Sequence, residues 1–95
     1  MIKDEYKEKL IEIINKHLPT TKIYLYGSRA RGDHAEGSDI DLAIDMGSPI
    51  DFTTLGTIKE KIEESTIPLF VDVIDVNVSS SDFIASIKKD WIKWQ

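Results

Sequence analysis

The segment at positions 39–45, DIDLAID, constrains the fold of this chain most, because apolar and acidic side chains nearly alternate along it. Successive side chains of a β-strand point to opposite faces, so this alternation predicts a strand with a core face and an acidic face. The core face would carry Ile40, Leu42 and Ile44, and the acidic face Asp39, Asp41, Ala43 and Asp45. Because an unpaired buried charge is costly, we expect a cation beside Asp39 and Asp41.

Hydrophobic periodicity predicts helices and strands on both sides of this segment. Amphipathic helices are predicted over 2–18 and 52–62, the second with Phe52 on its apolar side. A strand over 22–27 leads into a short helical turn, SRAR, and 69–76 is an apolar run typical of a strand covered on both faces. Ser79 and Asp82 form a capping-box pattern that opens a last helix, with Trp91 and Trp94 on its buried side.

This order of elements predicts a small α+β (α/β) fold, with one three-stranded sheet and flanking helices, over residues 1–95 as a single domain. The 95 residues include no cysteine, which argues against disulfides and thiolate metal sites. No apolar run is long enough for a membrane span, so a soluble, cytoplasmic protein is expected. A net charge of −5 argues against strong non-specific binding to nucleic acid.

The Asp39 and Asp41 pair favours a small, hard cation. Side chains at i and i+2 of a strand lie roughly 6.5 Å apart, close enough to reach around one Mg²⁺ or a pair of ions. Asp-x-Asp is a weak motif by itself, however, because the chain holds ten aspartates and a solvated edge strand would look the same.

A third carboxylate, Asp72, interrupts the apolar run at 69–76 and is a candidate functional residue. If the strand that carries it lies beside the strand at 39–45, Asp72 completes a cluster with Asp39 and Asp41. Such a cluster suits phosphoryl or nucleotidyl transfer with two Mg²⁺ ions. Asp75 would lie on the opposite face near the strand end, where we expect it to be solvated.

The Gly27–Ser28 turn offers groups that can hold a phosphate oxygen, although an ordinary turn with Ser28 as helix N-cap fits equally. Arg29 and Arg31 could bind a triphosphate or pair with acidic surface groups, and Arg31 has the better claim. His34 could touch substrate, but a solvated loop position explains it more simply.

Gly27–Ser28, ten intervening residues and then Asp39–Ile40–Asp41 resemble the signature of the DNA polymerase β-like nucleotidyltransferase superfamily, in particular its minimal members. The resemblance implies a mixed sheet and ATP or another nucleotide bound with two Mg²⁺ ions. It places the nucleotide phosphates at Ser28, with Gly27 and Arg31 nearby. It also implies that Asp39 and Asp41 bind the metal and that Asp72 is the third carboxylate, near the attacking hydroxyl.

The same resemblance suggests a protein partner. Short members of the superfamily resemble the antitoxin halves of toxin–antitoxin pairs, whose toxin is an RNase with a HEPN (higher eukaryotes and prokaryotes nucleotide-binding) domain. In that setting the family member transfers AMP to toxin tyrosines. Two alternatives stay open: a vestigial module that neutralises a toxin by direct contact, and a nucleotidyltransferase with a small-molecule or RNA acceptor.

Overall fold

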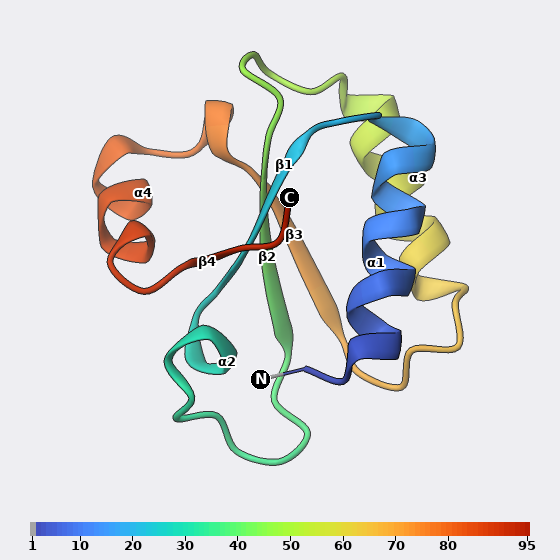
Figure 1. The fold of residues 1–95 in the computed structure, drawn as a ribbon. Coiled ribbons are helices and arrows are strands. Elements are labelled where there is room, and N and C mark those ends of the chain that lie inside the picture. The colour runs from blue at the N-terminus through green and yellow to red at the C-terminus, as the bar shows by residue number, and fades with distance from the viewer. Residues whose placement is uncertain (1) are drawn as a thin grey trace.

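The computed structural model describes residues 2–95 as a mixed four-stranded sheet between two layers of helices (Figure 1). Helices α1 (Asp4–His17) and α3 (Phe52–Glu63) lie side by side on one face, and α2 (Ser28–Arg31) and α4 (Ser81–Lys88) lie on the other. The strands are β1 (Lys22–Tyr26), β2 (Ile40–Asp45), β3 (Val71–Asp75) and β4 (Ile92–Lys93). A 3₁₀ turn, η1 (Val76–Val78), follows β3.

The strand order is β3-β2-β1-β4. β1 runs antiparallel to both β2 and β4, whereas β2 and β3 run parallel. The α+β class and the mixed sheet expected from the sequence are therefore confirmed. None of the helices formed by residues 2–95 has the length and hydropathy that spanning a bilayer needs.

The alternation in β2 divides the sheet as predicted. Ile40, Leu42 and Ile44 are fully buried against α1 and α3. Residues of α1 and α3 that recur at helical spacing supply the other side of this core, which includes Leu10, Ile14, Ile58 and Ile62. The acidic side of β2 consequently faces the layer that holds α2 and α4.

The sheet has a fourth strand where the sequence predicted a continuing helix. Helix α4 ends at Lys88, and Trp91 and Trp94 lie beyond it. Trp91 stacks on Tyr24 with 3.9 Å between ring centroids, and the backbone N–H of Trp94 donates to the Ile23 carbonyl at 2.8 Å. The three-residue spacing of the tryptophans fits a helix, but the exposed edge of β1 offers this segment backbone partners and an aromatic surface.

Two expectations about exposed aromatic side chains were wrong. β3 is an edge strand, and Phe70 just before it is 69% exposed rather than covered on both sides. Phe52 is 90% exposed, because it occupies the first turn of α3 before the helix reaches the core.

Helix α4 is capped by Ser80 and not, as the capping-box pattern had predicted, by Ser79. The Ser80 hydroxyl accepts from the Phe83 N–H at 3.2 Å, while the Ser79 hydroxyl donates to the Asp75 carbonyl.

Asp75 is buried, not solvated, with only 3% of its surface exposed. One carboxylate oxygen accepts from the Ile50 N–H at 2.7 Å, just before α3, and the other from the Asn77 N–H at 2.9 Å. These bonds satisfy both oxygens, so the carboxylate joins the end of β3 to the start of α3.

Candidate active site

Tyr26, Asp41 and Asp72 form a row across three adjacent strands. Asp41 of β2 is the register partner of Tyr26 in β1 and of Asp72 in β3. All three lie on the face opposite the core, because the alternate residues of each strand are those packed against α1 and α3. The structure thus brings Asp41 and Asp72 together, as the sequence predicted for neighbouring strands.

Negative charge is concentrated in this row, and only part of it is offset by Arg31. The pKa of Asp41 is raised, first by burial and then by the charges of Asp72 and Asp39, while Arg31 acts in the opposite direction. Burial and the charges of Asp41 and Asp72 also raise the pKa of Tyr26 to about 12. Within residues 2–95, neither Asp41 nor Asp72 accepts a hydrogen bond through its carboxylate. Their environment therefore favours a bound cation.

Asp39 lies just before β2 and is exposed, so it stands at the rim of the carboxylate group. No three His, Cys, Asp or Glu side chains of residues 2–95 converge into a ready-made metal site. The two carboxylates nevertheless fit Mg²⁺ chemically, because Asp41 and Asp72 are adjacent and accept no hydrogen bond from the described residues. Asp39 contributes negative charge at Asp41 and would need to turn inward to join them.

Gly27 is required where β1 turns into α2. Its φ is +76°, and a Cβ built there would lie 2.5 Å from Oδ2 of Asp41. Only glycine permits this close approach of the turn to the carboxylate. Gly27 is also the N-cap of α2, so the alternative in which Ser28 caps the helix is wrong. Within residues 2–95 the Ser28 hydroxyl forms no hydrogen bond, and it opens the helix next to Asp41.

The two arginines of α2 differ in their surroundings. Arg29 is 7% exposed, and its Nε donates to the Ser38 carbonyl at 3.0 Å, which holds the loop just before Asp39. Arg31 is exposed, and its Nε pairs with Asp33 at 3.1 Å. Its charge nonetheless lowers the pKa of Asp41, so Arg31 acts electrostatically on this carboxylate.

Two residues near the site were underestimated from the sequence. His34 is half-buried, and its Nδ1 atom is buried without a hydrogen-bond partner in the described part of the chain. Tyr26, expected only to pack on the sheet, also meets Phe83 of α4 edge to face at 6.1 Å between centroids. The sequence showed that Tyr26 directly precedes Gly27. That Tyr26 lies opposite Asp41 became known only from the strand register in the structure.

Asp45 lies on the same face as Asp41, at the other end of β2, and has a different environment. Its Oδ1 accepts from the Asn77 side chain and from the Gly47 N–H, each at 2.9 Å. Both bonds lower the pKa of Asp45, and the one from Asn77 has the larger effect. Asp45 therefore stabilises the turn after β2 and is not part of the active-site carboxylate group.

Comparison with known proteins agrees with this geometry. The family model described as polymerase beta, nucleotidyltransferase matches residues 8–92. A relative from Haemophilus influenzae named "Probable protein adenylyltransferase MntA" is 34% identical over 91 residues, which cover 96% of this chain and 80% of the relative.

Solved structures of toxin–antitoxin complexes share the fold. A chain of a toxin–antitoxin complex with AMP-PNP superimposes with a TM-score of 0.78 at 23% identity, covering 92% of this chain and 70% of the other. A complex of tri-AMPylated Shewanella oneidensis HEPN toxin with MNT antitoxin gives 0.75 at 19% identity, covering 97% and 71%. The resemblance seen in the sequence is confirmed: this chain belongs to the polymerase β nucleotidyltransferase family.

Proposed function

We propose that this chain is an Mg²⁺-dependent adenylyltransferase that moves AMP from ATP to a tyrosine of a HEPN toxin and thereby acts as its antitoxin. The observation that carries the proposal is the pairing of Asp41 with Asp72 beside the Gly27 turn, because neither carboxylate accepts a hydrogen bond in the part of the chain that the structure describes. This arrangement is costly in the free protein and becomes favourable when cations and a nucleotide bind. The reaction places the protein in the cytoplasm, where ATP is available.

Each residue then has a distinct task. Asp39, Asp41 and Asp72 would hold two Mg²⁺ ions, which when bound neutralise charge on the triphosphate. Gly27 leaves room for the phosphates, Ser28 donates a hydrogen bond to them, and Arg31 adds positive charge. Asp72, at the edge of the sheet, accepts the proton of the acceptor hydroxyl. The hydroxyl oxygen bonds to the α-phosphorus, the bond to the β-phosphate oxygen breaks, and pyrophosphate leaves.

Three relatives support the choice of acceptor. The H. influenzae relative is named for protein adenylyl transfer, and the two structural neighbours are toxin–antitoxin complexes, one with AMP-PNP and one with an AMPylated HEPN toxin. This chain spans most of each of them, so the likeness extends over the whole described sheet and its helices.

The test is AMP transfer to the HEPN protein that copurifies with this chain from its native host. We expect α-labelled ATP and Mg²⁺ to label that protein, and mass spectrometry to place AMP on a tyrosine. The variant Asp41→Asn is the matched control and should give no label. A complex that silences the toxin's RNase activity without any label would contradict the proposal and favour neutralisation by contact. Label on RNA or on a small molecule would assign a different acceptor.

A further inference from the structure

The outer edge of β3 is unpaired in the described part of the chain. β3 ends the strand order, with β2 on its inner side. The Phe70 carbonyl accepts from the Ile40 N–H at 2.9 Å, toward β2. Because backbone groups alternate in direction along a strand, Val71 and Val73 turn their N–H and C=O groups to the open edge. Such an edge can pair with an extended segment of another protein.

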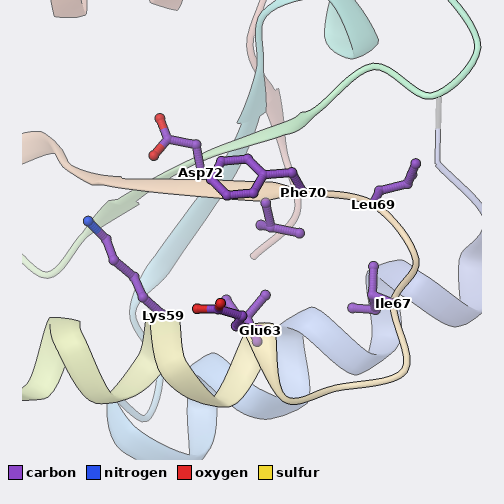
Figure 2. A pocket seen from close by; sticks show the side chains of 8 residues that line it. Lys59, Glu63, Ile67, Leu69, Phe70 and Asp72 are labelled. Atoms are coloured by element: carbon purple, nitrogen blue, oxygen red, sulfur yellow. The ribbon is translucent and has the colours of Figure 1, made fainter.

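A groove of about 300 Å³ runs between this edge and α3 (Figure 2). Its base is apolar, and Lys59 and Glu63 of α3 form the opposite wall, with Phe70 at the rim. The residues that line it are Lys59, Ile62, Glu63, Ile67, Leu69, Phe70, Val71 and Asp72. An exposed aromatic residue above an apolar groove is typical of a protein-binding surface.

Asp72 connects this groove to the active site. It lines the groove at the strand edge, its carboxylate points away from α3 (Figure 2), and it is also the register partner of Asp41. In Figure 2 the Phe70 ring lies beside Asp72, and Lys59 extends from α3 toward the same end. A group held in the groove would therefore reach Asp72 from the side opposite the Gly27 turn. That is the direction from which an acceptor must come if the nucleotide occupies the turn.

The groove favours a peptide over a polyanion. Glu63 and Asp72 outnumber Lys59 along it, and the whole chain carries a net charge of −5. RNA phosphates would be repelled, whereas an aromatic side chain can pack on the exposed Phe70 ring at the rim and extend its hydroxyl toward the neighbouring Asp72 carboxylate. The open strand edge supplies backbone hydrogen bonds that only an extended peptide can use.

We propose that this groove binds the tyrosine-bearing segment of the acceptor protein as an added strand along β3. The inference rests on the proposed AMP transfer and assigns the acceptor side of that same site. Phe70 packs against the segment, and Asp72 receives the tyrosine hydroxyl.

The first test compares Phe70→Ser with Phe52→Ser in AMP transfer to the copurifying HEPN protein. Both phenylalanines are exposed, but Phe52 does not line the groove. We expect Phe70→Ser to raise the KM for the acceptor about tenfold or more, with Mg·ATP affinity unchanged, and Phe52→Ser to behave as wild type. Equal KM values for Phe70→Ser and wild type would overturn the groove but not the transfer. Absence of label with wild type would instead refute the proposed function.

The second test does not depend on a substitution. Adding the acceptor should slow amide hydrogen exchange at Val71 and Val73, while Ile92 on the opposite edge of the sheet should exchange as before. Unchanged exchange at Val71 and Val73 in a complex that transfers AMP would overturn strand addition. Protection of both amides by this chain alone, rising with its concentration together with dimer formation, would assign the edge to a second copy and likewise overturn the proposal.

Discussion

The two ends of the β2–β3 pair hold aspartates in opposite circumstances. At one end Asp41 and Asp72 lie side by side, with no hydrogen-bond donor to their carboxylates among residues 2–95, and the pKa of Asp41 is raised by burial and by its acidic neighbours. At the other end Asp45 and Asp75 each accept two hydrogen bonds, and those on Asp45 lower its pKa. The residue type and the strands are the same, but the supply of donors differs, and Asp75 is also more deeply buried, on the core face of the sheet.

The difference separates carboxylates that stabilise the fold from those that await a ligand. A carboxylate surrounded by N–H groups is already solvated by the protein and gains little from a cation. A pair of carboxylates that repel each other destabilises the free protein, so such a pair points to a ligand that compensates for the repulsion. On this criterion we assign Asp41 and Asp72 to the proposed active site, and Asp45 and Asp75 to the scaffold.

The largest expected effect is loss of AMP transfer at the donor-free end. Asp72→Asn should lower transfer by at least about a hundredfold, because the carboxylate that accepts the hydroxyl proton is gone, yet keep most of the Mg·ATP affinity. Asp41→Asn and Asp39→Asn should impair both. Labelled AMP incorporation and calorimetry with ATP on the same variants check this. Full transfer by Asp72→Asn would mean that another group activates the acceptor.

A smaller effect is expected at the donor-rich end, and on stability rather than on nucleotide binding. Asp75→Asn keeps one acceptor oxygen and leaves either the Ile50 or the Asn77 N–H facing an amide NH₂. We expect it to lower the free energy of unfolding by about 1–3 kcal/mol, which corresponds to a fall in Tm of roughly 5–15 °C. Thermal denaturation measures this, and calorimetry should find Mg·ATP affinity unchanged. A wild-type Tm for Asp75→Asn would remove it from the scaffold group.

This division was only half accessible from the sequence. Alternation placed Asp41 on the acidic face of its strand, and the break in the apolar run singled out Asp72, because both signals are local in the chain. The solvated position expected for Asp75 was wrong, since one of its two donors, the Ile50 N–H, lies 25 residues away. The closer donor, the Asn77 N–H at i+2, forms an Asx turn with Asp75, a local contact that aspartate commonly makes.

The C-terminal segment was misassigned for a similar reason. Trp91 and Trp94 have a spacing that fits a helix, and nothing local predicts that Ile92 pairs with Leu25 of β1. A two-residue strand depends on the edge that it joins, so its own sequence carries little β signal. The positions of Asp41 and Asp72 on neighbouring strands were easier to predict than this edge, because the signals for them are local in the sequence.

The smallest effects concern pH and should have opposite signs at the two ends. The raised pKa of Asp41 means that its ionised form lowers stability above the folded pKa, and this penalty disappears below the unfolded pKa. The lowered pKa of Asp45 means that its contribution is present above the unfolded pKa and is lost as pH falls through the folded pKa.

In metal-free buffer at neutral pH, Asp41→Asn should therefore raise Tm slightly, and Asp45→Asn should lower it. The Asp41 difference should shrink as the pH is lowered to about 4, close to the unfolded pKa of an aspartate, because its folded pKa is raised. The Asp45 difference should largely persist to that pH and shrink only below it, because its folded pKa is lowered. Thermal denaturation across this range checks the signs. Two shifts in the same direction would show that the donor supply does not distinguish the two ends.

The central claim is that the Asp41–Asp72 pair is a cation-dependent nucleotide site, and ATP calorimetry with and without Mg²⁺ tests it most directly. We expect wild type to bind ATP measurably only with Mg²⁺, Asp75→Asn to behave as wild type when folded, and Asp41→Asn to lose the Mg²⁺-dependent affinity. Equal ATP affinity with Mg²⁺ and with a chelator, or Mg²⁺-dependent binding that survives in Asp41→Asn, would contradict the account.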